Sequence, residues 1–366
     1  MIPSISAFSD TYLPTLNGVT YTLTTWKKWW ERSGGKMHIV YPKSAHNSKQ
    51  NEWPIGSIKF PFYPGYRIAS PTYPPSLKNT DIVHTHTPFS LGIAGQNMAK
   101  KYNLPIVASY HTPLSKYVEY ISSNKSISTQ LSKASNYWEY SFLNRADLIL
   151  VHSKTALFDL QEMGVTSPII LLKNGIDISL FKPIETKYFL DKHGIDPDQT
   201  ILGYTGRHGH EKNIHELIQA SSSLDATILI GGVGPAKTKL ESQAKRLGTN
   251  VLFLGRLPRD ELSAFYSSLD LFVFPSPVET QGLVALESIA CGTPVVAANK
   301  GALIETVTDG KTGTHYCSGD TSSLVSKISE TLQNKNNLSK SCINHRDSIS
   351  VDTTIHQLSQ IYRSLL

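Results

Sequence analysis

Two glutamates stand eight positions apart in the segment SPVETQGLVALESIACGTPV, residues 276–295. An apolar run typical of a buried strand ends at Ser276, and an apolar helical pattern begins after Gly282. Because successive helical residues turn by about 100°, two helical side chains at this spacing would point about 80° apart. We therefore predict that Glu279 lies in the loop before the helix and that Glu287 points from within it.

The backbone N–H groups of Gly282, Leu283 and Val284 open this predicted helix. The first N–H groups of a helix have no intrahelical partner, and they lie at the positive end of the helix dipole, so they favour phosphate oxygens. A carboxylate beside a bound phosphate would repel it. The two glutamates are therefore better suited to neutral hydroxyls, one on each side of the phosphates.

A second candidate loop, YTGRHGHEKN, follows a predicted strand at residues 204–213. Arg207 can bind a diphosphate as a bidentate fork and Lys212 as a point charge; an ordinary charged loop is the alternative. His208 and His210 do not belong to a pattern with Asp, Glu or Cys ligands, so we do not expect a metal there.

Two glycine-containing loops carry weaker signals. Asn17 and Gly18 form a predicted tight turn directly before a helix, where backbone N–H groups can face an anion. An ordinary turn is the alternative at this position. The segment IGGVGPAK at residues 230–237 lacks the G-x-G-x-x-G spacing, so its glycines are predicted to form turns.

The chain has 366 residues, which is enough for two domains of about 150 to 200 residues each. Its cysteines, Cys291, Cys317 and Cys342, are widely spaced and contain no C-x-x-C. This argues against disulfides or a zinc site and favours a reducing compartment. The first residues are typical of a buried strand, and no apolar run approaches the roughly 20 residues needed to span a bilayer. We expect a soluble, cytoplasmic protein.

Charge is distributed unevenly along the chain. Residues 1–173 hold 14 Lys and 3 Arg against 4 Asp and 5 Glu, whereas the remainder holds 18 basic and 20 acidic residues. A basic half favours anionic partners such as nucleic acid, an acidic lipid surface or a phosphorylated substrate. A solvated lysine-rich surface is the alternative.

Short apolar strands alternate with helical patterns in both halves of the chain, which predicts βαβ units and parallel sheets. We expect an α/β fold with two doubly wound, Rossmann-like domains, at residues 1–180 and 181–345. Residues 346–366 form a predicted amphipathic helix that can return to the first domain. Ligands bind outside the carboxyl ends of parallel strands, so the cleft between the domains is the expected site.

The motifs occur in an order that resembles the retaining glycosyltransferases of family 4, which have the GT-B fold and include sucrose, trehalose and glycolipid synthases. The matching segments span most of the chain: NGV at 17–19, SYHT at 109–112, LKNGIDISLF at 172–181, GYTGRHGHEKN at 203–213, FLGRLPRDEL at 253–262, and E-x7-E at 279–287 followed by CGTPVV. Each motif is weak alone, and together they are specific. The resemblance implies a hexosyltransferase that uses a nucleotide-diphosphate sugar and needs no cofactor or nucleic-acid partner.

The resemblance implies a role for each matching residue that contacts the nucleotide. Gly18 offers its backbone to the donor diphosphate, and Arg207 and Lys212 neutralise it. Leu257 lies where the family holds the base, and Glu287 binds the ribose hydroxyls.

The transferred sugar has two implied neighbours. Glu279 binds one of its hydroxyls, and His111 lies beside the sugar on the opposite wall; a hydrogen-bonded strand-end histidine is the alternative. No second carboxylate is placed as a nucleophile for double displacement. The family is thought to react on one face, and the leaving diphosphate helps to deprotonate the acceptor. We expect no metal, and we interpret DPD at residues 196–198 as a surface turn.

Several segments most resemble diacylglycerol glucosyltransferases and related lipid-directed enzymes, including YVEYI at 117–121 and Gln281 before the glycine. This favours a UDP-glucose donor, a lipid acceptor and peripheral attachment to an anionic membrane. WKKWW at residues 26–30 fits either that membrane or the core side of a helix. Arg67 is expected in a loop that contacts an anionic headgroup.

Two other functions are compatible with the sequence. A transferase of the same fold can use GDP-mannose or UDP-GlcNAc and act on a soluble glycan. A non-catalytic protein that binds nucleotide sugars is the third possibility, and the intact set of candidate residues argues against it.

Overall fold

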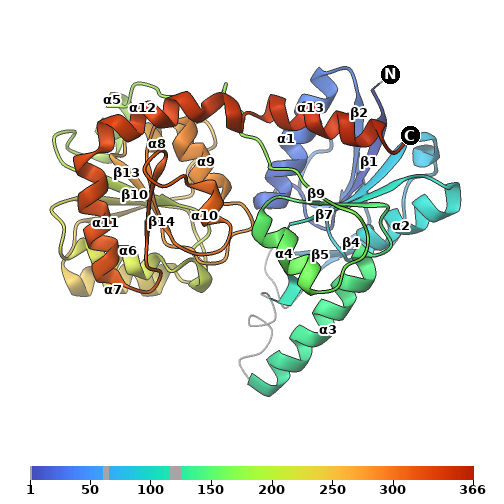
Figure 1. Cartoon of the computed structure of the whole chain (residues 1–366), viewed down its shortest axis with the longest axis horizontal. Coiled ribbons are helices and arrows are strands. Elements are labelled where there is room, and N and C mark those ends of the chain that lie inside the picture. The colour runs from blue at the N-terminus through green and yellow to red at the C-terminus, as the bar shows by residue number, and fades with distance from the viewer. Residues whose placement is uncertain (1, 61–65, 112, 116–124) are drawn as a thin grey trace. The chain divides into compact units, whose positions relative to one another are not determined.

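The computed structural model describes residues 2–60, 66–111, 113–115 and 125–366. The chain forms two compact units, one made of Met1–Asn174 with Val351–Leu366 and the other of Gly175–Ser350. The division falls at residue 174 rather than at the expected 180, and the chain returns to the first unit at residue 351 rather than 346. Figure 1 shows the elements of each unit.

The first unit is built on a seven-stranded parallel sheet of order β3-β2-β1-β6-β7-β8-β9. The strands β4 and β5, which follow β3 in the sequence, form a separate short antiparallel pair. The strands are β1 (Ser4–Phe8), β2 (Lys36–Pro42), β3 (Glu52–Ile55), β4 (Ser57–Lys59), β5 (Arg67–Ala69), β6 (Ile82–Thr85), β7 (Ile106–Tyr110), β8 (Leu148–Val151) and β9 (Ile169–Leu171).

Helices cover both faces of this sheet. Side chains alternate along β1, so Ile5 and Ala7 belong to one buried cluster and Phe8 belongs to the other. Val351 and Tyr362 of the last helix belong to the cluster of Ile5, and that helix packs beside the first helix in Figure 1. The helices are α1 (Gly18–Arg32), η1 (Pro75–Asn79), α2 (Ser90–Tyr102), α3 (Lys125–Leu143), α4 (Lys154–Glu162) and α13 (Val351–Arg363).

The WKKWW stretch lies on α1 and contributes to the core of the first unit. Trp26 and Trp30, one helical turn apart, are 1% and 0% exposed, and Trp29 is partly buried. The Trp30 indole N–H donates to the Pro3 carbonyl at 3.1 Å, and its ring packs edge-on against Tyr362 at 5.3 Å. Of the two interpretations of this stretch, the structure supports the core side of a helix.

The second unit is built on a six-stranded parallel sheet of order β12-β11-β10-β13-β14-β15. Its strands are β10 (Ile201–Thr205), β11 (Thr227–Gly231), β12 (Val251–Gly255), β13 (Leu271–Phe274), β14 (Val295–Ala298) and β15 (Gly313–Tyr316). Its helices are α5 (Lys187–His193), η3 (His210–Lys212), α6 (Ile214–Ser221), α7 (Lys237–Leu247), α8 (Leu262–Ser267), α9 (Leu283–Ala290), α10 (Leu303–Thr306), α11 (Thr321–Gln333), α12 (Lys335–His345) and η4 (Arg346–Ile349).

The two parallel sheets confirm the predicted fold class of two doubly wound, Rossmann-like units. One local expectation is wrong: Arg67 lies in strand β5 instead of a loop, because β5 pairs with β4 and the Arg67 guanidinium donates to Ser57 Oγ at 2.8 Å and to its carbonyl at 2.9 Å. Among the described residues, no helix combines the length and the apolar character needed to cross a membrane.

Candidate active site

In the second unit, backbone hydrogen bonds hold the loops after β10 and β11 together. The His208 N–H donates to the Val233 carbonyl at 3.0 Å, and the Ala236 N–H donates to the His208 carbonyl at 2.9 Å. A Cβ at Gly232 would lie 1.9 Å from the Gly206 carbonyl oxygen, and the φ of Gly232 is +112°. The glycines of IGGVGPAK are therefore needed for this close approach between loops, in addition to the predicted turns.

The loop after β10 places Lys212 next to Glu279, a second predicted site residue. Lys212 Nζ lies 2.7 Å from Glu279 Oε1, and the side chains are 20% and 15% exposed. Arg207 forms a second ion pair on the same loop, with Glu211 Oε1 at 3.2 Å. Arg207 and Glu211 are both more exposed than Lys212 and Glu279. The candidate diphosphate ligands are thus already paired with carboxylates.

Helix α9 begins as predicted between the two glutamates of the E-x7-E motif. Gly282 is its N-cap residue with φ +79°, and a Cβ there would lie 2.7 Å from Leu303 Cδ2. No described side chain caps the helix, and the first N–H groups of a helix have no intrahelical partner, so the first turn of α9 stays a candidate anion site. Glu279 lies in the preceding loop.

Glu287 lies inside α9 and is 5% exposed. The Tyr266 hydroxyl of α8 donates to Glu287 Oε2 at 2.7 Å. Burial raises the pKa of Glu287 to about 7, although the bond from Tyr266 opposes this shift. Tyr266 was not identified from the sequence, because contact between α8 and α9 is a tertiary feature without a local signal.

The other two candidate nucleotide contacts lie in different units. Leu257 follows β12 and is half-buried, and a Cβ at Gly231 would lie 3.0 Å from Leu257 Cδ1, so it borders the end of β11. Gly18 is the exposed first residue of α1 in the first unit. The Asn17 side chain caps this helix by accepting from the Thr20 N–H at 2.9 Å.

His111 directly follows β7 of the first unit and belongs to a cluster of four buried histidines. His86 Nδ1 lies 2.9 Å from His111 Nε2, and the rings stack with centroids 5.2 Å apart. The His152 ring also contacts the His111 ring, with centroids 4.9 Å apart. The His84 ring lies tilted against the His86 ring, with centroids 4.1 Å apart. The residue after His111, Thr112 of the SYHT motif, lies outside the described residues, as does YVEYI.

The cluster is closed by residues from both ends of the chain. His84 Nδ1 lies 2.6 Å from the Tyr362 hydroxyl of α13, and His84 Nε2 lies 2.9 Å from Ser109 Oγ. The Trp26 ring packs against His84, His86 and His152 at about 6 Å. Burial holds the pKa of all four histidines below the ordinary value, so the cluster is neutral at pH 7.

The sequence contains a signal for this cluster in VHTHTP. His84 and His86 stand two positions apart at the end of a strand, a spacing that puts both on one face. The contributions of His152 and Tyr362 come from distant segments and have no such signal.

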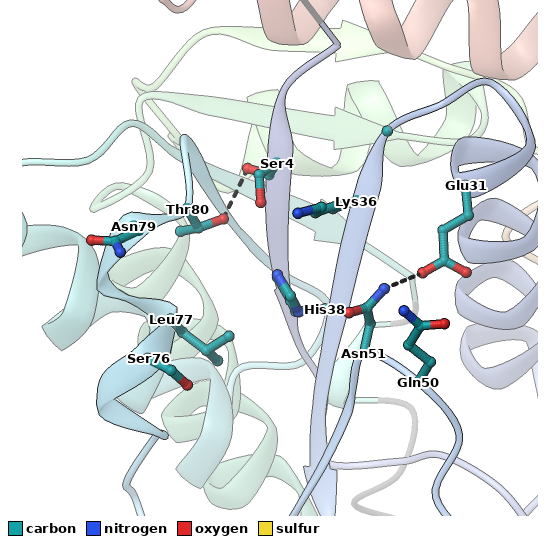
Figure 2. A pocket seen from close by; sticks show the side chains of 11 residues that line it. Ser4, Glu31, Lys36, His38, Gln50, Asn51, Ser76, Leu77, Asn79 and Thr80 are labelled. Carbon is teal, nitrogen blue, oxygen red and sulfur yellow. Dashed lines mark hydrogen bonds between the residues drawn. The ribbon is translucent and has the colours of Figure 1, made fainter.

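A cavity of about 530 Å³ lies at the opposite edge of the same sheet (Figure 2). Its wall includes Ser4 and Lys36 at the amino ends of β1 and β2, and Thr80, whose hydroxyl donates to the Ser4 carbonyl at 2.8 Å. The Asn51 amide donates to Glu31 at 2.7 Å beside it. Because parallel sheets bind ligands at the carboxyl ends of their strands, this cavity is distinct from the predicted site.

Two protein-family models match the chain, one in each half. "Glycosyltransferase Family 4" matches residues 16–180, and "Glycosyl transferases group 1" matches residues 186–347.

Among curated relatives, an alpha-monoglucosyldiacylglycerol synthase of Streptococcus pneumoniae is 29% identical over 85% of this chain and 75% of its own length. A sulfoquinovosyl transferase of Arabidopsis thaliana is 34% identical over 70% of this chain, which spans half of that relative. A GDP-mannose-dependent alpha-mannosyltransferase of Corynebacterium glutamicum is 26% identical over 84% of this chain and 75% of its length.

Solved structures share the fold over almost the whole chain. Sucrose-phosphate synthase of Thermosynechococcus elongatus aligns with a TM-score of 0.80 at 22% identity, covering 99% of both chains. The Anabaena protein HepE, crystallised with UDP and glucose, aligns with a TM-score of 0.79 at 20% identity, covering 99% of this chain and 100% of HepE. The chain belongs to glycosyltransferase family 4, the group 1 glycosyltransferases of GT-B fold, and is a hexosyltransferase of this retaining family.

Proposed function

We propose that this enzyme transfers glucose from a UDP-glucose-type donor to a hydroxyl of a membrane lipid, with retention and without a metal. The observation that carries the proposal is the arrangement around α9. Lys212, at the end of η3, forms an ion pair with Glu279 in the loop before α9, and Glu287 is buried within α9. A cation, an open helix N-terminus and two carboxylates match a diphosphate flanked by two sets of hydroxyls.

In this proposal the second unit stabilises the departing nucleotide. The bond between the sugar C1 and the phosphate oxygen breaks while the acceptor oxygen bonds to C1 on the same face. The acceptor proton passes to the leaving diphosphate. Arg207, Lys212 and the amides at Gly282 offset the negative charge that develops on the diphosphate, and Glu279 binds a hydroxyl of the sugar.

The first unit is proposed to contribute His111 and the backbone of Gly18 to the same donor. His111 is neutral and buried, with one ring nitrogen bound to His86. A neutral imidazole can exchange hydrogen bonds with a sugar hydroxyl without adding charge near the developing oxocarbenium ion.

The choice of donor rests on the relatives. The Anabaena structure contains UDP and glucose, and the streptococcal relative is named for glucosyl transfer, so we favour UDP-glucose. Leu257 is proposed to border the uracil. The mannosyltransferase of Corynebacterium glutamicum, which is named for GDP-mannose, supports GDP-mannose as the second candidate donor.

A lipid acceptor is supported by an exposed apolar surface on the first unit, which we call the hairpin surface. Ile58 and Ile68 are cross-strand partners in β4-β5, and both are exposed. Tyr66 precedes β5 and its ring contacts the exposed Phe89 ring edge-on at 6.4 Å. The exposed Trp138 of α3 continues the surface by donating to the Pro88 carbonyl at 2.7 Å.

The charges of the hairpin surface complement an anionic bilayer. Lys59 and Lys133 are exposed, and Lys133 lies one helical turn before the exposed Tyr137 of α3. The segments 57–60, 66–69, 88–90 and 129–138 contain no Asp or Glu. Tyr, Trp and Phe side chains together with Lys are typical of surfaces that rest at the membrane interface. The headgroup contact expected at Arg67 belongs to this surface.

Vesicle co-sedimentation tests the lipid interface. Vesicles with phosphatidylglycerol should bind the enzyme, binding should fall as salt rises, and the double variant Ile58→Ser with Tyr137→Ser should bind less. Tyr188→Ser is the matched control, because Tyr188 is an exposed aromatic of the second unit. Equal binding by all variants, or none at any salt, would favour a soluble acceptor.

The metal-free mechanism has its own test. Transfer activity should persist after dialysis against EDTA, because the proposed stabilising charges belong to the chain itself. Full loss with recovery on adding Mg²⁺ would contradict this part of the proposal.

A further inference from the structure

The ion pair between Lys212 and Glu279 joins two groups that the proposed function assigns to different parts of the donor. Lys212 is assigned to the diphosphate and Glu279 to the sugar, yet their charged atoms lie 2.7 Å apart. Both side chains are mostly buried, so solvent screens their attraction less than at the surface. To bind both residues, a donor must therefore replace the contact between Lys212 and Glu279.

A nucleoside diphosphate without a sugar and a complete donor affect this pair differently. When a diphosphate takes the Lys212 ammonium, Glu279 loses its partner and lies near added negative charge, which is unfavourable. A donor also brings sugar hydroxyls, which can donate hydrogen bonds to the Glu279 carboxylate in place of Lys212. Only the complete donor satisfies both members of the broken pair.

Resting on the proposed function, we propose that Lys212 and Glu279 form a ligand-exchange switch that selects nucleotide sugars over nucleoside diphosphates. The pair closes when no donor is present and opens when diphosphate and sugar bind together. After transfer the sugar leaves Glu279, and the carboxylate competes again for Lys212. This competition speeds the release of the nucleoside diphosphate product.

The neighbouring pair of Arg207 and Glu211 does not have this property. Both residues lie on one short segment, four positions apart, and both are more exposed than Lys212 and Glu279. Glu211 is not assigned to the sugar, and water can replace its contact with Arg207 at little cost. The discrimination between donor and product therefore depends on Glu279.

Calorimetry with UDP tests the switch directly. Glu279→Gln keeps the size of the side chain and removes its charge, so UDP should bind about tenfold more tightly than to the unmodified enzyme. The control is Glu241→Gln on α7, which removes a more exposed carboxylate of the same unit, 3.5 Å from Lys237, and should leave UDP affinity unchanged. In the Lys212→Gln background, the gain from Glu279→Gln should shrink, because no ammonium remains to be released.

The outcomes separate this inference from the proposed function. Unchanged or weaker UDP binding in Glu279→Gln would overturn the switch, as would an equal gain in Glu241→Gln or a full gain in the Lys212→Gln background. If neither UDP nor GDP binds any of these proteins, the proposed function itself fails. Retained circular dichroism and thermal transitions would show that each variant is folded.

Discussion

The strand-end loops of the two units carry different kinds of polar group. The first unit presents neutral, buried imidazoles whose rings contact one another: His84, His86, His111 and His152. The second presents carboxylates already paired with cations, as in Lys212 with Glu279. A neutral cluster suits uncharged hydroxyls, whereas an ion pair suits an anion that can replace one of its members. In the proposed function, the same scaffold is therefore used for two kinds of recognition.

The largest expected effect is on the charged side of this comparison. Lys212→Ala should slow transfer by about 100-fold or more, because stabilisation of charge in the transition state by one such group is worth about 3 kcal/mol. Lys237→Ala is the matched control, because it removes an exposed paired cation from the same unit. Steady-state kinetics would measure the turnover of both variants. Near-normal turnover in Lys212→Ala would contradict the proposed charge stabilisation by the second unit.

The next effect concerns donor binding at Glu287. Glu287→Ala should weaken donor affinity about thirtyfold, since a hydrogen bond to a charged group is worth about 2 kcal/mol. Tyr266→Phe removes only the 2.7 Å hydrogen bond from the Tyr266 hydroxyl to Glu287 and should weaken donor affinity much less. Calorimetric titration would distinguish them, and unchanged affinity in Glu287→Ala would contradict a ribose contact.

A smaller effect is expected in the neutral histidine cluster of the first unit. His86→Leu should lower kcat about tenfold with little change in donor affinity, because it removes the 2.9 Å contact that orients His111. His86→Asn places an amide near the position of Nδ1 and should recover part of the activity. Equal losses in both variants would indicate that His86 only supports packing.

The smallest effect is a dependence of stability on pH. Burial lowers the pKa of His152 from 6.5 to about 4. Between these values the unfolded chain binds a proton that the folded unit excludes, so stability falls as pH drops below 6.5. At pH 5.5 the cost is about 1 kcal/mol.

His152→Asn isolates this effect, because the amide can still donate to the Leu172 carbonyl as His152 Nδ1 does now. Urea unfolding at pH 7 and 5.5 should show a smaller loss of stability in the variant. An equal loss in both proteins would show that His152 does not contribute to the acid sensitivity.

Most of the strands were predictable because buried parallel strands are continuous apolar runs between helical patterns. Strand β5 was expected to be a loop. Strands β3 (EWPI) and β15 (GTHY) were not predicted either, because neither segment has such a run. Both lie at sheet edges, where proline in β3 is tolerated. The return of α13 to the first unit depends on packing of Tyr362 against Trp30, which local patterns do not encode.

The candidate site was predictable where function follows the local order of strand, loop and helix. The position of Gly282 between Glu279 and Glu287 is of this kind. The pairing of Lys212 with Glu279 was not predictable, because it joins loops 67 positions apart. The contacts of His111 with His86 and with His152 likewise depend on neighbouring strands.

The most direct test of the central claim is a transfer assay with diacylglycerol-containing anionic vesicles. UDP-glucose, UDP-galactose, UDP-GlcNAc and GDP-mannose would be compared as donors, and the anomeric configuration of the product would be determined by NMR. We expect an α-linked glucolipid from UDP-glucose, with the anomeric configuration of the donor retained. A β-linked product, or transfer only from another donor to a soluble acceptor, would contradict the account.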